Sequence, residues 1–173
     1  MTNRIRILGI DPGSRVTGFG VLDFENDRAG YVASGSIRSA EGDFAARLRL
    51  IFRSVGELVS EYRPDAAVIE TVFVHRNAMS ALKLGQARSA ALCATFESEL
   101  TVYEYAPREI KQAVVGSGAA TKAQVQHMVV SLLSLQGAPS PDAADALAAA
   151  LCHGHQRRLQ ARIAGAPAAA SSR

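Results

Sequence analysis

The chain has 173 residues, of which 48% are hydrophobic and 20% charged, and its formal net charge is +3. This composition predicts one soluble globular domain and excludes an intrinsically disordered chain. No apolar run reaches the roughly 20 residues that a membrane helix needs, and the N-terminus lacks the apolar core of a signal peptide. We therefore expect a cytoplasmic protein without a membrane partner, whose charge permits a polyanionic ligand without demanding one.

The first forty residues have the pattern of a three-stranded antiparallel meander. Residues 5–10 are apolar and rich in β-formers, and they end at the turn sequence Asp-Pro-Gly-Ser. A second such run covers 17–24, and a third covers 31–37 after Glu-Asn-Asp. The sequence predicts two successive hairpins here.

Helices and strands alternate in the rest of the chain. Apolar residues at helical spacing between Asp43, a candidate N-cap, and Pro64 predict an amphipathic helix. The short apolar run 66–69 predicts a buried central strand that ends at Glu70, and 101–105 predicts another strand. Further helices are expected over 78–97, over 107–115, after Thr121 and from Pro141. This order predicts an α/β fold with a mixed five-stranded sheet flanked by helices.

The C-terminal segment and the cysteines show no sign of a second functional unit. The stretch after Ala164 is rich in Ala, Ser and Pro, so we expect one domain over 1–158 and a flexible tail over 159–173. Cys93 and Cys152 lie in alanine-rich segments without paired spacing, which predicts buried reduced thiols. His153 and His155 are two apart on a predicted helix and face different directions, so they make a poor metal pair.

Four acidic residues stand at the ends of predicted elements. Asp11 ends the first strand and Glu70 the central one, while Asp142 and Asp145 share one face of the last helix. Carboxylates gathered at one sheet edge raise one another's pKa, and divalent cations remove that conflict. Oxygen ligands favour Mg²⁺ or Mn²⁺ over Zn²⁺, and two such ions can clamp the attacking and leaving oxygens of a phosphodiester.

Each acid taken alone also has a structural explanation. An aspartate before Pro-Gly forms turns, Asp142 could complement a helix dipole, and Asp145 could be an exposed helical acid. Glu70 is harder to explain in this way, because a strand-terminal acid after a buried run needs a partner or a purpose.

Six stretches of the sequence, in order along the chain to about His155, resemble the crossover-junction endonuclease family RuvC. They are Gly-Ile-Asp-Pro-Gly at 9–13, Ile-Glu at 69–70 with Val-Phe at 72–73, and the segments 81–88, 111–116, 124–128 and 142–147. The resemblance implies a ribonuclease H-like fold, a homodimer and Mg²⁺-dependent paired cuts across Holliday junctions in recombination and repair. It also implies two metal ions per site, Mn²⁺ as a substitute, and the RuvA–RuvB branch-migration complex as a partner.

The resemblance assigns site residues as well. Catalytic and metal-binding roles fall on the same four acids, Asp11, Glu70, Asp142 and Asp145. Lys111 and Lys122 match lysines near the scissile phosphate or the DNA backbone, where the alternative is a solvated helix lysine. Phe73 matches an aromatic that stacks on unpaired bases, where the alternative is a core phenylalanine. Looser candidates for DNA contact are Arg15, Arg76, Lys83 and Arg88.

Two departures or ambiguities accompany the resemblance. Thr71 follows Glu70 where many relatives carry glutamine, which puts a supporting contact in doubt.

The helix expected over 78–97 is rich in small residues and resembles the family's dimerisation helix, and a two-fold enzyme suits two symmetric cuts. Ordinary packing within one chain would explain the same composition.

Three other functions compete with the junction nuclease. The segment 9–20 also looks like the phosphate loop of actin-like and sugar-kinase ATPases, but those enzymes use two such domains and this length supplies one. A junction-binding scaffold without nuclease activity would use the acids only as structural ions. A related short nuclease family, which acts on ribosomal RNA precursors, would prefer structured RNA.

Overall fold

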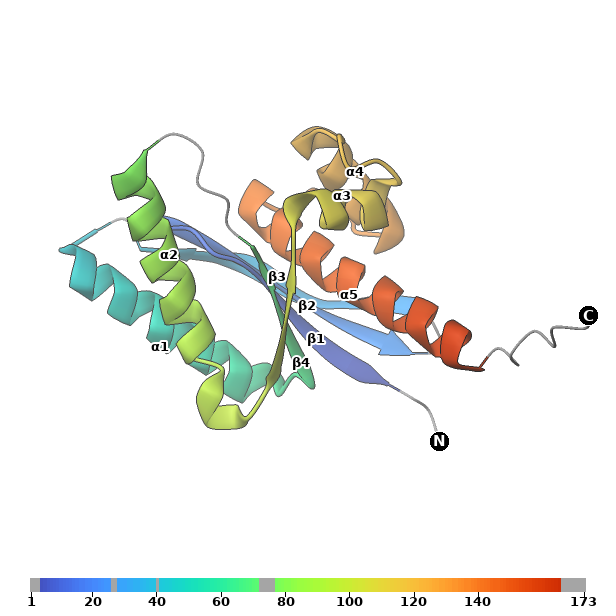
Figure 1. Ribbon diagram of the computed structural model, residues 1–173, viewed down its shortest axis with the longest axis horizontal. Helices are drawn as coiled ribbons and strands as arrows, with labels where there is room; N and C mark the ends of the chain where they lie inside the picture. The colour runs from blue at the N-terminus through green and yellow to red at the C-terminus, as the bar shows by residue number, and fades with distance from the viewer. Residues whose placement is uncertain (1–3, 26–27, 40, 72–76, 166–173) are drawn as a thin grey trace, which may run out of the picture.

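The protein forms a three-layer α/β structure around one mixed sheet (Figure 1). The computed structural model describes residues 4–25, 28–39, 41–71 and 77–165. The sheet has the strand order β3-β2-β1-β4-β5. Strand β2 pairs antiparallel with both β1 and β3, while β4 pairs parallel with both β1 and β5. This confirms the predicted meander with two added strands. The strands are β1 (Ile5–Asp11), β2 (Val16–Glu25), β3 (Arg28–Arg38), β4 (Ala66–Glu70) and β5 (Thr101–Tyr105).

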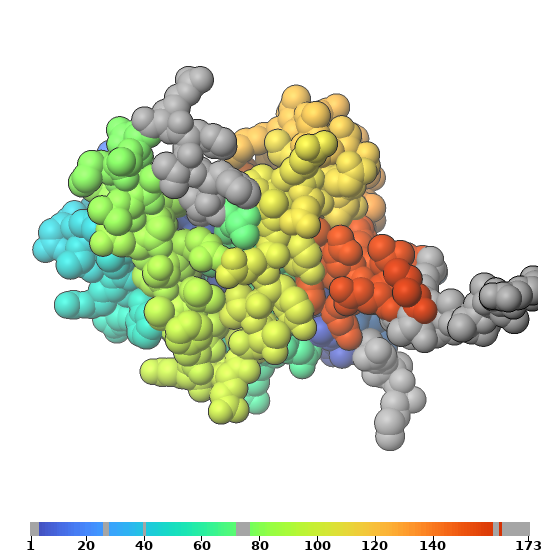
Figure 2. Space-filling view, viewed as in Figure 1, coloured from blue at the N-terminus to red at the C-terminus, as the bar shows by residue number. Residues whose placement is uncertain are grey.

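Helices cover both faces of the sheet. Successive side chains of β1 point to opposite faces of the sheet, and each face has its own core. Leu8 and Ile10 pack under α1 and α2, while Ile7 packs under α3, α4 and α5. Figure 2 shows that the segments from α2 through α4 make up most of one face of the molecule. The helices are α1 (Phe44–Tyr62), α2 (Ala78–Cys93), α3 (Pro107–Val115), α4 (Lys122–Leu132) and α5 (Pro141–Gly165), with a 3₁₀ turn at Phe96–Ser98.

Helix α2 is shorter than the sequence predicts. It ends at Cys93 rather than at residue 97, and the Thr95 hydroxyl donates a hydrogen bond of 2.8 Å to the carbonyl of Leu92. Such a side-chain bond competes with helical backbone pairing, and Glu99 then adopts a left-handed conformation with φ of 51°. The expectation of two buried thiols was wrong in part, because Cys152 is buried but Cys93 is exposed.

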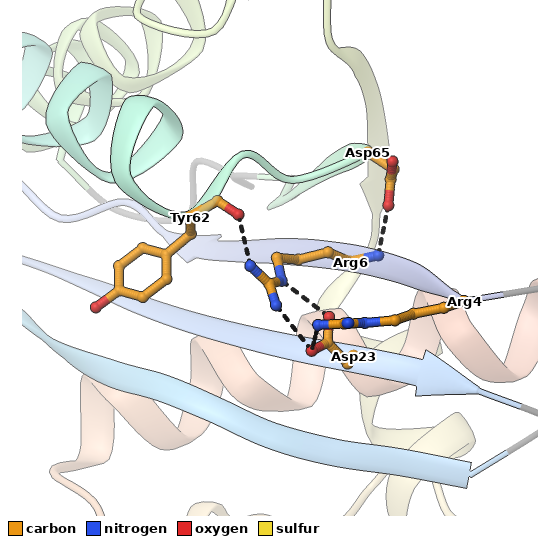
Figure 3. Close-up of polar contacts among 5 residues, drawn as sticks. All are labelled: Arg4, Arg6, Asp23, Tyr62 and Asp65. Carbon is orange, nitrogen blue, oxygen red and sulfur yellow. Dashed lines mark hydrogen bonds and ion pairs between the residues drawn. The ribbon is translucent and has the colours of Figure 1, made fainter.

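A polar cluster closes the end of the sheet where β1 begins (Figure 3). Arg6 donates to Asp23 at 2.8 and 2.9 Å and to the carbonyl of Tyr62 at 2.9 Å, and Arg4 donates to the same aspartate at 2.6 Å. The hydrogen bond from Arg6 lowers the pKa of Asp23. The cluster fixes this end of β1, and Asp11 lies at the other end of the strand.

Helix α5 continues to Gly165, past the domain boundary expected at residue 158. Within the ranges that the structure describes, no helix combines the length and apolar character of a membrane span.

Candidate active site

Strand geometry directs two of the four acids toward α5. Side chains alternate along a strand, so Asp11 shares the face of Ile7, and Glu70 shares the face of Val68. Ile7 and Val68 both belong to the core under α5. Because β1 and β4 are parallel neighbours, the two acids leave adjacent strands at the same edge of the sheet.

The start of α5 supplies the other two acids. The Ser140 carbonyl accepts the N–H of Ala144 at 2.8 Å, and the Ser140 hydroxyl lies 2.9 Å from that of Ser36 on β3. These bonds begin the helix over the meander, with Asp142 in its first turn and Asp145 one turn later. The predicted sharing of one helix face by the two aspartates therefore places both beside the strand ends.

Glycines let α5 lie directly on the sheet. A Cβ built on Gly18 would lie 2.0 Å from the carbonyl oxygen of Asp142, and one on Gly9 would lie 2.0 Å from that of Ala146. Gly18 is also the register partner of Asp11. The helix backbone that carries Asp142 thus lies against the strand residue paired with Asp11, at a distance that no other amino acid permits.

The acids share one electrostatic environment. Burial, followed by repulsion from Glu70 and Asp145, raises the pKa of Asp11 to about 8. Burial and repulsion from Asp145 also raise the pKa of Glu70. Asp142 contributes a smaller repulsion to Asp11. The other three predicted carboxylates therefore all lie within electrostatic range of Asp11.

Two lysines oppose this negative charge. Lys122, at the first position of α4, forms an ion pair of 2.8 Å with Asp145, although its side chain is 76% exposed. This bond raises the pKa of Lys122. Lys111 on α3 also lies within electrostatic range, because it lowers the pKa of Glu70. Both lysines that the sequence singled out therefore border the acidic site.

The donor chemistry of the site fits a hard divalent cation. The four acids offer carboxylate oxygens, and two of these carboxyls have raised pKa values that a cation would reverse. In the part of the chain that the structure describes, no three acidic, histidine or cysteine side chains converge tightly enough to form a ready-made coordination shell. The residues that could hold metal are Asp11, Glu70, Asp142 and Asp145.

Neighbouring residues fix the end of β4 that carries Glu70. The backbone N–H of Thr71 donates to the carbonyl of Tyr105 at 2.9 Å, and its hydroxyl donates to the same oxygen at 3.3 Å. Arg88 on α2 donates to the carbonyl of Glu70 at 3.3 Å and forms an ion pair of 2.9 Å with Glu104. Thr71 thus provides a supporting contact of its own beside Glu70.

The other candidates for DNA contact lie in different settings. Arg15 is exposed in the turn after β1. Lys83 is exposed on α2, with its ammonium 5.8 Å from the ring centre of Phe44. Phe73 and Arg76 lie outside the described residues. The DNA contacts of all these residues stay predictions.

Sequence reasoning missed the glycines that seat α5. Gly18 and Gly20 occupy alternate positions of one predicted strand, and Gly9 lies two residues before Asp11. Glycine within a strand weakens it and often marks close approach of another backbone. This spacing was therefore an available signal for a helix packed against that face.

A mixed five-stranded sheet, with acids at two neighbouring strand ends and on a helix lying across them, defines the class of ribonuclease H-like nucleases. Comparison with known proteins then identifies the family. The family model for crossover junction endodeoxyribonuclease RuvC matches residues 7–153. The chain belongs to the RuvC family.

Individual relatives agree with this assignment. The RuvC endonuclease of Alkalilimnicola ehrlichii is 58% identical over 158 residues, which cover 91% of this chain and 96% of the relative. That of Colwellia psychrerythraea is 56% identical over 161 residues and 92% of each chain. The solved structure of Thermus thermophilus RuvC in complex with a Holliday junction substrate is 36% identical, has a TM-score of 0.84, and matches over 90% of this chain and 96% of its own. A yeast mitochondrial Holliday junction resolvase, 12% identical with a TM-score of 0.65 over 90% of this chain and 82% of its own, shares the fold.

Proposed function

We propose that this chain resolves four-way DNA junctions by Mg²⁺-dependent hydrolysis, with Asp11, Glu70, Asp142 and Asp145 as metal ligands. The observation that carries the proposal is the meeting of four partly buried acids, two of them with raised pKa values, where the ends of β1 and β4 face the start of α5. Membership of the RuvC family supports the junction as substrate and disfavours the ATPase. Support also comes from the similar Thermus thermophilus structure, which was solved in complex with a Holliday junction substrate.

Metal would supply the chemistry that the side chains lack. When bound, two Mg²⁺ or Mn²⁺ ions would provide Lewis-acid activation of water and stabilisation of the departing 3′ oxygen. The four carboxylates would orient the ions, since their oxygens are the ligands that these cations prefer. Lys111 and Lys122 would neutralise phosphate oxygens of the bound strand, because both stand at the rim of the acidic site.

The proposal includes a homodimer formed through α2. This helix exposes Met79 by 61% and Leu82 by 55%, beside a hollow of about 780 Å³ that small residues of α2 help to line. Exposed apolar side chains of this kind indicate a contact with another molecule. A two-fold dimer would present two active sites to two symmetric strands.

We place the enzyme in the cytoplasm, where the bacterial chromosome lies, with RuvA–RuvB as its partner at the junction. The relatives are bacterial endodeoxyribonucleases, which supports the location.

We also propose a single nuclease domain, whose boundary moves from residue 158 to 165 because α5 is continuous to Gly165. Removing residues 166–173 should leave the melting temperature and the cutting rate unchanged.

The decisive experiment is cleavage of a synthetic mobile four-way junction in Mg²⁺, compared with linear duplex and structured RNA. We expect paired nicks in the junction from the wild-type chain and none from Asp142→Asn. Junction binding without nicking in Mg²⁺ or Mn²⁺ would contradict the catalytic assignment and favour a scaffold. Preferential cutting of RNA would favour the RNA-processing nuclease.

A further inference from the structure

A buried histidine on α5 lies outside the acidic site and has no role in the mechanism proposed above. His153 is 2% exposed and packs against two tyrosines of β5. Its Nδ1 lies 2.9 Å from the hydroxyl of Tyr105, so the two groups share a hydrogen bond. Its ring lies over that of Tyr103, with the two ring centres 4.0 Å apart.

Stability alone does not explain a histidine here. Its second ring nitrogen, Nε2, is buried and has no hydrogen-bond partner among the described residues. A buried polar atom without a partner costs about 1 to 3 kcal/mol, so an apolar side chain of similar size would pack at least as well. The shared hydrogen bond with Tyr105 is the feature that an apolar residue would lose.

Tyr105 connects this bond to the active site. It is the register partner of Glu70 across the β4–β5 ladder, and its carbonyl accepts both hydrogen bonds from Thr71. Strand β5 lies at the edge of the sheet, and among the described strands it pairs with β4 alone. The tyrosine hydroxyl reaches from this edge strand to α5, the helix that also carries Asp142 and Asp145.

We propose that Tyr105 and His153 are positioning residues. Their hydrogen bond fastens the paired ends of β4 and β5 to α5, and it thereby holds Glu70 in place relative to the aspartates of that helix. The inference rests on the proposed function, because it concerns the geometry of the same metal site. This bond is a second connection between the sheet and α5. It runs through β5, whereas the glycine contact runs through β1 and β2.

The shared bond persists across the working pH range. Burial, with repulsion from Arg157, lowers the pKa of His153 to about 4, and burial raises the pKa of Tyr105 to about 12. Both groups are therefore neutral near pH 7, and neither brings a charge that would disturb the acidic site.

The first test compares Tyr105→Phe with Tyr103→Phe in the full chain. Both changes remove one hydroxyl and keep the ring beside His153, but only the first removes the shared hydrogen bond. The readout is calorimetric titration of Mn²⁺ into the DNA-free protein, together with the melting temperature. The bond would act on Glu70 through the β4–β5 pairing rather than by direct contact, so we expect Tyr105→Phe to weaken Mn²⁺ binding by about 10-fold, the low end for partners hydrogen-bonded to metal ligands, and Tyr103→Phe to leave it unchanged.

A second pair of variants separates positioning from stability. His153→Leu removes the bond and also the unpartnered nitrogen, so we expect the melting temperature to hold or rise while Mn²⁺ affinity falls. His153→Asn keeps an amide group near the place of Nδ1, and it should recover part of the affinity. In cleavage assays, the Mg²⁺ concentration for half-maximal rate should rise, with junction affinity unchanged.

Wild-type Mn²⁺ affinity in both Tyr105→Phe and His153→Leu would overturn the proposal. So would a loss of affinity that simply follows a loss of melting temperature and occurs equally in Tyr103→Phe. Failure of the proposed function looks different: the wild-type chain would bind Mn²⁺ but leave the junction uncut, and the Mn²⁺ titrations of the variants would still decide the positioning role.

Discussion

Asp11 lies where burial and neighbouring carboxylates make its negative charge unfavourable. In the metal-free protein its pKa is about 8, whereas an unfolded chain would leave it near 3.8. Between these values the folded state binds a proton that the unfolded state does not, so the free energy of unfolding falls as pH rises from about 4 to about 8. The raised pKa of Glu70 adds to the same trend.

We therefore expect Asp11→Asn to flatten this dependence. At pH 8 and without metal, the variant should be more stable than the wild type by at least about 1 kcal/mol, because it removes a partly buried charge that neighbouring carboxylates repel. Urea unfolding in chelator across this pH range measures the effect, with the exposed Glu57→Gln as control. A wild-type stability that does not change between pH 5 and 8 would contradict the raised pKa.

Lys122 lowers the pKa of both Asp11 and Glu70. Lys122→Met should raise both values further, so protons should compete better with metal and the acidic limb of the cleavage–pH profile should move to higher pH. At neutral pH we expect a rate loss on the order of 100-fold, since the lysine would also stabilise phosphate charge. Arg53→Met, which removes an exposed positive charge from α1, away from the residues proposed to contact DNA, is the control. An unshifted profile would exclude the electrostatic role.

At the scale of elements, the seating of α5 on β1 and β2 determines the site geometry. Gly18→Ala would place a methyl group 2.0 Å from the carbonyl oxygen of Asp142, so the helix must move. We expect a loss of about 2 kcal/mol or more in stability and loss of cleavage. Gly56→Ala is the control, because nothing lies within 4 Å of its Cβ and alanine favours a helix. Thermal unfolding and junction cleavage measure both, and equal behaviour of the two variants would contradict the close contact.

The sequence predicted elements well where one local signal decided them. Asp43 and Thr121 cap the helices expected after them, and β1 and β4 end at the expected acids. Helix α2 was predicted too long, because its alanines extend the helical pattern past the point where Thr95 interrupts it.

Contacts between distant segments could not be predicted in this way. The pairing of Lys122 with Asp145 and that of Arg88 with Glu104 depend on how separate elements pack. The sequence identified both basic residues, but it did not reveal these partners. For Arg88, the structure shows a contact with the backbone of Glu70 in addition to the predicted role at DNA.

At the scale of the whole molecule, the proposed dimer should determine how many strands are cut. Leu82→Glu places a charge on the exposed apolar surface of α2, and we expect it to shift sedimentation from dimer to monomer. Paired nicks should then become rare, while the melting temperature stays close to that of the wild type. Leu159→Glu, on the exposed side of α5, is the control. A dimeric Leu82→Glu protein would place the interface elsewhere.

The contact between α5 and the first hairpin also determines when, during translation, the active site can form. Asp11 leaves the ribosome early, but the helix that completes its surroundings begins only at Pro141. A nascent chain must therefore keep the glycine-bearing face of β1 and β2 uncovered through most of its synthesis, and contacts of such long sequence separation form late in folding. We expect ribosome-bound chains that stop before Ser140 to be inert on DNA, so cutting competence arises only when translation is nearly finished.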